Sequence, residues 1–259
     1  MIKISIASTF YNDKETLKAV MDSVLSQTYS NIEHCITDGS STDGSVELIK
    51  EYEEKYRQAG KELKWISEKD KGLYDGANKS FSMATGDYVI WATDIYYNSE
   101  SISRIASEIM KQHCDYVYGG LIFERKGVII RRWSGKPGNW RLGWMAADST
   151  FCYRRSLFDK YGPYDISYKS AADYKLQVKL FQDKSLTSSP IVEPLVIFDA
   201  GGASNGGVKA NVVSIKENFR IMKECNVKFG WFTVICKMTI AFFAYIFNSH
   251  QKINLEDKK

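Results

Sequence analysis

Short apolar runs alternate with stretches of helical periodicity along the first half of the chain. Four runs are rich in apolar and β-prone residues: IKISIAS (2–8), NIEHCITD (31–38), LKWISEKD (63–70) and DYVIWATD (87–94). After the first run, apolar residues recur at the spacing of a helix face, at Leu17, Val20, Met21, Val24 and Leu25. Further helices are predicted over 45–58, 74–84 and 99–113. The alternation predicts an α/β fold, with βαβ units around a mostly parallel, Rossmann-like sheet flanked by helices.

The pattern changes beyond Gly119. The segment LIFERKGVIIRRW (121–133) has strand-like residues on both sides of Lys126 and Gly127, which predicts a hairpin. A small antiparallel piece is therefore added to the parallel half. No repeat, low-complexity tract or linker interrupts the chain, so we expect one main domain followed by a tail.

The tail contains the nearly continuous apolar segment WFTVICKMTIAFFAYIF (231–247). It is shorter than the roughly 20 residues of a spanning helix and carries Lys237 near its middle, so spanning is disfavoured. Two interpretations remain. The helix lies in the membrane surface, with Lys223, Lys228 and Lys252 on anionic lipid, or it is buried against the domain or another subunit.

Composition narrows the class of protein. The 259 residues are 44% hydrophobic and carry a formal net charge of +4, which suits an anionic substrate or a lipid surface. There is no dense Lys/Arg stripe, so nucleic acid is not an expected partner. Five scattered cysteines without a Cys-x-x-Cys pair indicate neither disulfides nor a zinc site. The N-terminus lacks the pattern of a signal peptide, and we expect a cytoplasmic location.

Polar residues follow each of the first four predicted strands. They are Thr9, Asp38, Asp70 and Asp94. Ligands of open parallel sheets bind at the carboxyl ends of the strands, so these side chains are expected to meet in one crevice. Each also has a local explanation.

The local explanations are structural. Asn12 and Glu15 have the spacing of a capping box for the first helix. Asp38 opens the turn-forming segment DGSSTDGS and could bond only its own backbone. Asp75 and Lys79 are four residues apart on a helix and could form a surface ion pair. Singly, none of these residues is specific for a function.

The order of the motifs is specific. The segments STFYN, DGSSTDGS, SEKDKGLYDGANKS, GDYVIWATD, AADYKLQVKLF and IFDAGGAS resemble the inverting family-two glycosyltransferases with the GT-A fold, especially those of bacterial surface-polysaccharide biosynthesis. The resemblance runs from Ile2 to Ser204. It implies a GT-A domain over 1–210, with a nucleotide-sugar-binding half (1–118) and an acceptor half (119–210), and a C-terminal helical tail (211–259).

The resemblance also implies site residues. Those implied for the nucleotide sugar are Thr9, Tyr11, Asn12, Asp38, Asp70, Asp75, Asn78, Lys79 and Asp94. Asp38 would accept the ring N–H of uracil. Asp94 would face the diphosphate and a divalent cation, Mn²⁺ or Mg²⁺. Relatives carry two acids at this strand end, whereas Ile95 follows here, but such cations often take only one or two protein carboxylates.

Asp173 is the implied catalytic base. It follows Ala171 and Ala172, precedes Tyr174, and would take the acceptor proton in a single displacement that inverts the sugar configuration. The structural alternative is a helix cap, because Ser170 and Asp173 have capping-box spacing.

The segment from Ala146 to Asp165 resembles the acceptor side of relatives. Asp148, Arg154 and Arg155 are its candidate residues, with Asp148-Ser149 in place of a frequent His-Gln. The acceptor would be a saccharide or a lipid-linked saccharide, so the protein would lie in the cytoplasm or on the inner face of the plasma membrane.

Two other functions stay open. One is a non-catalytic scaffold of a polysaccharide-assembly complex, to which the single acid at Asp94 lends weight. The other is a sugar nucleotidyltransferase, although STFYNDKET lacks a Gly-rich phosphate loop. A homo-oligomer also stays open.

Overall fold

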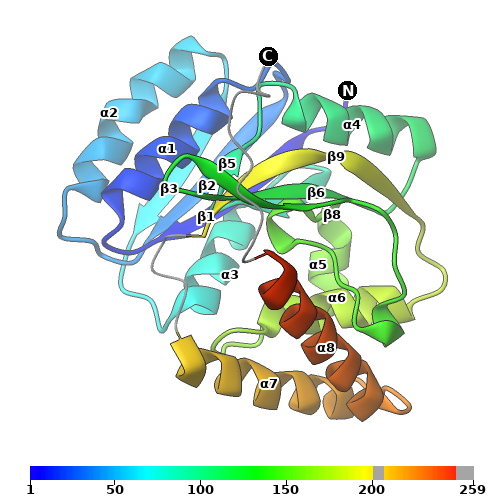
Figure 1. Ribbon diagram of the computed structural model, residues 1–259. Coiled ribbons are helices and arrows are strands. Elements are labelled where there is room, and N and C mark those ends of the chain that lie inside the picture. Colours follow the sequence, from blue (N-terminus) through cyan, green and yellow to red (C-terminus); the bar gives the residue numbers. More distant parts are fainter. Residues whose placement is uncertain (201–206, 249–259) are drawn as a thin grey trace.

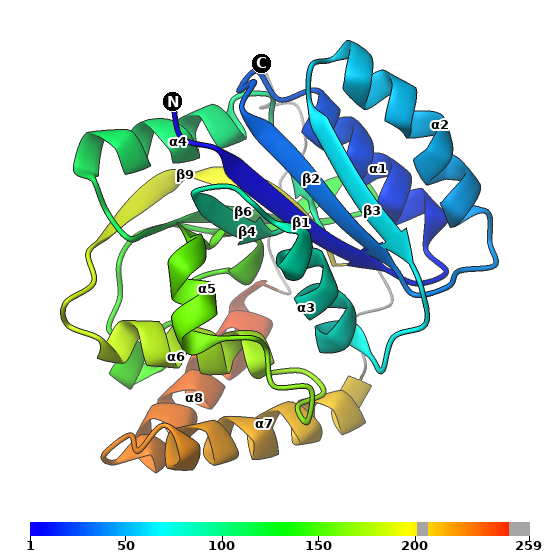
Figure 2. The ribbon, with the colours of Figure 1, turned by 180° about the vertical axis from the view of Figure 1, so that it is seen from behind.

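A mixed β-sheet runs through the protein, and helices cover both of its faces (Figures 1 and 2). The computed structural model describes residues 1–200 and 207–248, so Lys252 and the end of the IFDAGGAS segment lie outside the described residues. The strands are β1 (Ile4–Phe10), β2 (Ile32–Asp38), β3 (Glu62–Ser67), β4 (Tyr88–Trp91), β5 (Ile95–Tyr96), β6 (Tyr116–Arg125), β7 (Val128–Trp133), β8 (Cys152–Arg154) and β9 (Ser188–Asp199). The α-helices are α1 (Lys14–Leu25), α2 (Ser45–Gln58), α3 (Leu73–Met83), α4 (Ser101–Gln112), α5 (Arg155–Tyr161), α6 (Ala172–Gln182), α7 (Gly207–Glu224) and α8 (Gly230–Asn248). Two 3-10 helices, η1 (Trp140–Leu142) and η2 (Asp148–Thr150), lie between β7 and β8 in the chain.

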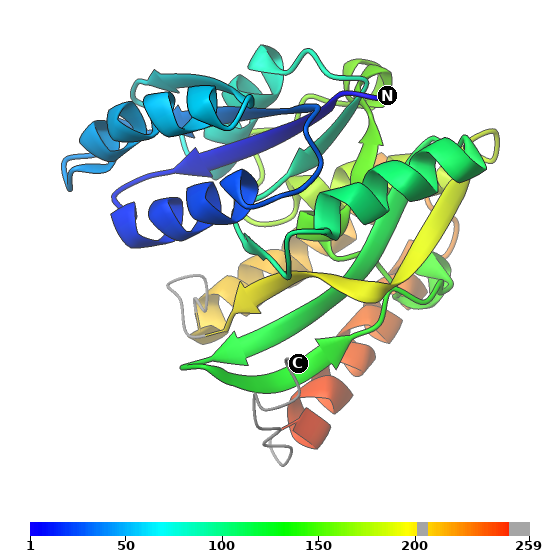
Figure 3. The ribbon, with the colours of Figure 1, turned by 90° about the horizontal axis from the view of Figure 1, so that it is seen from above.

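The described strands form one sheet in the order β3-β2-β1-β4-β8-β6-β9-β5, and β7 pairs with β6. The first four strands are parallel, and β6 is parallel to β9. β8 runs antiparallel to both β4 and β6 and joins the two parallel parts. β7, β6 and β9 lie side by side (Figure 3). The prediction of a mostly parallel α/β sheet with a small antiparallel piece is confirmed.

Side chains alternate between the two faces of the sheet. In β4, Tyr88 and Ile90 belong to the core under α1, α2 and α4, whereas Val89 and Trp91 belong to the core under α3, α5 and α6. All four are buried, because a central parallel strand has helices over both faces. This explains why the β4 sequence is a continuous apolar run rather than an alternating one.

The β6–β7 hairpin turns where the sequence predicts. Lys126 and Gly127 connect the strands, and both have positive φ, 51° and 79°. Two consecutive residues of this kind give a turn whose twist matches that of paired strands. The predicted hairpin is confirmed.

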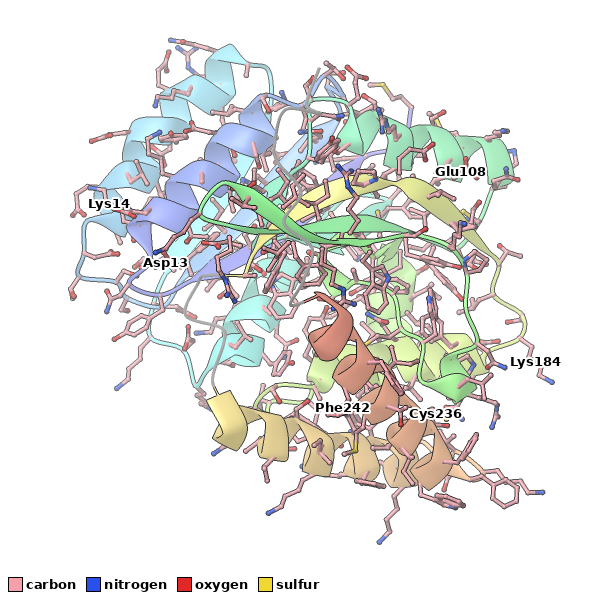
Figure 4. All side chains as sticks on the ribbon, viewed as in Figure 1. Asp13, Lys14, Glu108, Lys184, Cys236 and Phe242 are labelled. Carbon is pink, nitrogen blue, oxygen red and sulfur yellow. The ribbon has the colours of Figure 1, made fainter. Side chains whose placement is uncertain are left out.

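The first helix is capped differently from the prediction. Asp13, labelled in Figure 4, is the N-cap of α1, and its carboxylate accepts a hydrogen bond from the Thr16 backbone N–H. Asn12 instead has a left-handed φ of 49°, and its side-chain oxygen accepts from the Thr42 backbone N–H at 2.8 Å. The predicted capping box of Asn12 and Glu15 is therefore wrong, because Asn12 serves a tertiary contact.

The C-terminal helices α7 and α8 pack below the sheet, against the core under α3, α5 and α6 (Figure 1). Ile221 and Met222 of α7 and Val234 of α8 are buried members of that core. Among the described helices, none has both the length and the mean hydropathy needed to cross a membrane.

Candidate active site

A cavity of about 310 Å³ lies at the carboxyl edge of the sheet. Three carboxylates from separate segments line it: Asp94 after β4, Asp148 in η2 and Asp173 in the first turn of α6. Much of the remaining wall is apolar and comes from β6, β7 and β9, with Leu121, Phe123, Trp133 and Phe198. The cavity therefore combines a cluster of acids with an aromatic and aliphatic wall.

The direction of β8 explains why two of these acids meet. β8 is antiparallel to β4, with Cys152 opposite Ile90 and Arg154 opposite Tyr88. The chain therefore enters β8 at the edge of the sheet where β4 ends. Asp148 precedes β8 and Asp94 follows β4, so both lie at that edge.

Asp173 is held from two sides. It lies at the second position of α6, and the Tyr74 hydroxyl of α3 donates a hydrogen bond to its Oδ1 at 2.7 Å. The N-cap of α6 is Ala171, without a side-chain cap, and the backbone and side chain of Ser170 donate to Glu217 instead. The capping box proposed for Ser170 and Asp173 is therefore wrong.

Burial dominates the ionisation of the three acids. It raises the pKa of Asp94 to about 6, and a hydrogen bond from Ser149 opposes the rise. Burial, and then the charge of Asp173, raise the pKa of Asp148 well above its usual range. Burial also raises the pKa of Asp173, while the hydrogen bond from Tyr74 opposes it. A cavity of clustered, desolvated acids is typical of a site for proton transfer or cation binding.

The loops after β1 and β2 are joined by hydrogen bonds. The Asn12 backbone N–H donates to Ser41 Oγ at 2.8 Å, and the Asn12 side chain accepts from Thr42. Thr9, at the end of β1, lies under α3, since a Cβ added to Gly76 would be 2.3 Å from Thr9 Oγ1. The glycine allows α3 to approach the strand end closely.

Asp38 is fully buried at the end of β2. Its Oδ2 accepts from the Ser41 backbone N–H at 3.0 Å and from Ser67 Oγ at 2.6 Å. Its Oδ1 is buried and has no hydrogen-bond partner among the described residues. A buried carboxylate oxygen without a donor is costly, so this atom indicates a missing donor.

Tyr11 and Asp70 meet at Gly39. A Cβ added to Gly39 would be 2.7 Å from Asp70 Oδ2 and 3.2 Å from Tyr11 Cδ2. Asp70 also accepts from the Gly72 backbone N–H at 3.0 Å, which fixes the turn before α3. The loops after β1, β2 and β3 therefore form one continuous rim.

The predicted residues of α3 make intramolecular contacts. Lys79 pairs with Glu68 at 2.9 Å and lies 3.6 Å from Asp75. Asp75 accepts from the Lys71 backbone N–H. Asn78 exchanges two hydrogen bonds of 2.8 Å with the Tyr164 backbone and fixes that loop against α3.

Arg154 and Arg155 lie away from the cavity. Arg154 is opposite the first residue of β4, at the other edge of the sheet from Asp94, and pairs with Asp115 at 2.9 Å. Arg155 pairs with Asp159 of its own helix at 3.2 Å. Of the three acceptor-side candidates, only Asp148 lines the cavity.

Sequence reasoning missed Tyr74 and Lys237. Tyr74 carries no motif that identifies it as the partner of Asp173. The sequence does offer Trp133, Trp140 and Trp144 as candidates for stacking on a sugar ring; Trp133 lines the cavity, whereas Trp144 packs against Tyr118 and Phe181 in the core. Lys237 also acts on the charge of Asp173, and its position within an apolar helix was the available signal.

The fold is the GT-A fold, and solved structures share it. A mannosyltransferase from Pyrobaculum calidifontis in complex with GDP-Man and Mn²⁺ matches 97% of this chain and 76% of its own, with a TM-score of 0.66 and 12% identity. Staphylococcus aureus TarS in complex with UDP matches 77% of this chain, with a TM-score of 0.57 and 17% identity; the chain spans 61% of that protein's chain.

A family model named "Glycosyl transferase family 2" matches residues 5–167, and the chain belongs to this family. A PGL/p-HBAD biosynthesis glycosyltransferase of Mycobacterium tuberculosis is 28% identical over 207 residues, which are 78% of each chain. The protein is therefore a glycosyltransferase by family, with relatives in glycan biosynthesis.

Proposed function

We propose that this protein is an inverting glycosyltransferase that moves a hexose from a UDP-linked nucleotide sugar to a hydroxyl of a saccharide or lipid-linked saccharide, in cell-surface polysaccharide biosynthesis. The observation that carries the proposal is the meeting of Asp94, Asp148 and Asp173 in one cavity, at the edge of the sheet where β1, β2 and β3 also end. A donor on the rim would present its anomeric carbon to these acids.

Asp38 supports a nucleotide donor. Its free buried Oδ1 would accept the ring N–H of the uracil, which supplies the missing donor. Thr9, Tyr11, Asn12 and Asp70 would border the nucleoside from the same rim. Structural neighbours are complexes with UDP and with GDP-Man, which supports a nucleotide-linked donor.

Asp94 fits a divalent cation, Mn²⁺ or Mg²⁺. Among the described residues, no group of three or more His, Cys, Asp or Glu side chains is arranged to hold a metal alone. One carboxylate is enough where diphosphate oxygens and water complete the coordination. When bound, the cation would neutralise charge on the leaving diphosphate.

Asp173 would act as the general base. Its carboxylate takes the proton of the acceptor hydroxyl while that oxygen bonds to the anomeric carbon, and the carbon–oxygen bond to the diphosphate breaks with its electrons on the leaving UDP. Tyr74 would orient the base through the 2.7 Å hydrogen bond to Oδ1. Attack opposite the nucleotide would invert the configuration.

We further propose the division of labour expected from the sequence. Residues 1–118 would hold the nucleotide sugar, and 119–210, including Asp148, would hold the acceptor. The tail, 211–259, would bring the protein to the inner face of the plasma membrane. Large apolar side chains exposed on α8 support this location.

Asp173→Asn tests the proposal. Asn keeps the size of Asp and can accept the Tyr74 hydrogen bond, but it cannot take a proton. We expect transfer to fall about 10²–10⁴-fold, mainly in kcat, with unchanged UDP affinity and melting temperature. The measurement is turnover over a panel of nucleotide sugars with lipid extract, with products identified by mass spectrometry.

Asp159→Asn is the matched control, because it removes an exposed carboxylate that pairs with Arg155 of its own helix and does not line the cavity. Its turnover should equal that of the parent protein. Parental turnover in Asp173→Asn would exclude Asp173 as the base. Calorimetric titration with UDP, with and without Mn²⁺, tests the donor site separately, and a scaffold would show no metal-dependent binding.

A further inference from the structure

The polarity of α8 is reversed relative to that of a surface helix. Its outward side chains are apolar, and Trp231, Ile235, Met238 and Phe242 are 57%, 46%, 41% and 61% exposed. The opposite face, with Thr233 and Val234, is buried. Lys237 lies three and four residues further along that buried face and is the one charged residue in the sequence of α8. A helix that turns its single charge inward needs a partner for that charge.

The backbone of α8 at Lys237 is fixed by close packing. Gly143, which ends η1, has a positive φ of 84°. A Cβ at Gly143 would be 2.3 Å from the Lys237 backbone nitrogen, so only glycine allows this approach. The contact therefore locks the position of Lys237 along the core.

The ammonium group of Lys237 lies next to the residue that follows Asp173. Its Nζ is 3.4 Å from the centroid of the Tyr174 ring, and it donates to the Oδ1 of buried Asn218 at 3.3 Å. Burial lowers the pKa of Lys237 to about 8, although the charge of Asp173 opposes this decrease. The group is therefore mainly protonated at neutral pH.

Asp173 is surrounded by groups from separate segments. Tyr74 of α3 donates to it, the charges of Asp148 and Asp173 repel each other across the cavity that Asp94 also lines, and Lys237 of α8 attracts the negative charge of Asp173. In residues 1–200 and 207–248, no basic side chain lines the cavity. Lys237 therefore supplies a positive charge from outside the cavity, whose charged lining residues are all acidic.

We propose that Lys237 is a positioning residue for the reaction, which holds Asp173 ionised and the Asp173–Tyr174 turn of α6 in place. This inference rests on the proposed role of Asp173 as the base. It makes the C-terminal helix a part of the catalytic site, although α8 lies outside the segment that the family model matches.

The test is the pH dependence of kcat/KM in the full chain, with the nucleotide sugar and acceptor extract that give the highest turnover. Lys237→Met removes the charge, and Lys237→Gln removes it while keeping a donor for Asn218. In both variants the acid limb should move upward by about one pH unit, because loss of a nearby positive charge favours protonated Asp173. Lys237→Arg should restore the parental acid limb. A structural contact alone would lower turnover equally at every pH.

Lys184→Met is the matched control, because Lys184 is exposed on the loop between α6 and β9, outside α8 and outside the residues that line the cavity. Its acid limb should equal that of the parent protein. An unmoved acid limb in either neutral Lys237 variant, at parental melting temperature, would overturn the inference. If Asp173→Asn keeps parental turnover, the proposed function fails instead, so the two failures are distinguishable.

Discussion

Glu33 is a charged residue buried far from the cavity. It lies within β2, and its Oε2 is 2.7 Å from Lys3 Nζ and 2.8 Å from Lys64 Nζ. It also accepts hydrogen bonds from Ser5 and Thr85. Burial alone would raise the pKa of Glu33, but the hydrogen bonds from Lys3, Lys64, Ser5 and Thr85 outweigh it and hold the pKa well below its usual range. The network joins β1, β2, β3 and the start of β4.

Glu33→Ala should lower the free energy of unfolding by roughly 1–3 kcal/mol, because it leaves the buried donors of Ser5 and Gly86 without their carboxylate acceptor, whereas Lys3 and Lys64 keep Glu62 as a partner. A depressed folded-state pKa means that the stabilisation is complete above the unfolded-state pKa of about 4.3 and decreases as the pH falls further. Urea unfolding of parent and variant between pH 7 and pH 3 measures both effects. The two stabilities should converge toward acid pH, and a constant difference would contradict the assignment.

At the scale of elements, Gly143 decides how α8 packs on η1. Gly60 offers a comparison, because it too has positive φ, 64°, but a Cβ there would meet nothing within 4 Å. Substitution by Ala introduces backbone strain at both positions, about 1 kcal/mol. Only at Gly143 does it also force two elements apart.

Gly143→Ala should therefore lower the melting temperature more than Gly60→Ala does. The free energy of unfolding should decrease by about 1–3 kcal/mol more in Gly143→Ala than in Gly60→Ala, which is the usual cost of overpacking. Turnover should fall in Gly143→Ala alone, since Lys237 moves with α8. Thermal unfolding and steady-state kinetics of both variants measure these effects. Equal melting temperatures and equal turnover in the two variants would show that α8 does not pack closely on Gly143.

At the scale of the whole molecule, the outward face of α8 exposes a series of large apolar side chains. Aromatic residues dominate it, and exposed Lys223 and Lys228 lie near its N-terminal end. Aromatic and aliphatic side chains flanked by lysines are typical of a helix in the interface of an anionic bilayer. Phe242, labelled in Figure 4, is the most exposed large apolar side chain in the described part of α8.

Phe242→Ser should weaken binding to phosphatidylglycerol vesicles at low salt by about tenfold, because it removes a side chain whose burial contributes roughly 1.5–3 kcal/mol. Ile166→Ser is the matched control, since Ile166 is 50% exposed on a loop outside α8. Co-sedimentation with vesicles measures both. If the parent protein does not bind vesicles but forms a dimer that Phe242→Ser dissociates, the outward face of α8 is a subunit interface.

Sequence alone determined the features that depend on local periodicity and turn chemistry. The first four strands, the helices between them and the turn at Lys126 and Gly127 follow from neighbours a few residues apart. The rule that parallel strands end at one edge also located Asp38 and Asp94 correctly at that edge. These predictions need no knowledge of how distant segments pair.

Tertiary structure decided the features that depend on strand direction and packing. Arg154 and Asp148 are close in sequence, yet the antiparallel pairing of β8 sends them to opposite edges of the sheet. Asn12 does not cap α1 as predicted, because its side-chain oxygen accepts a hydrogen bond from Thr42 in the loop after β2. Lys237 reaches Tyr174 only because Gly143 admits the backbone of α8. Long-range contacts of this kind leave little local signal in a single sequence, since the residues that make them are far apart in the chain.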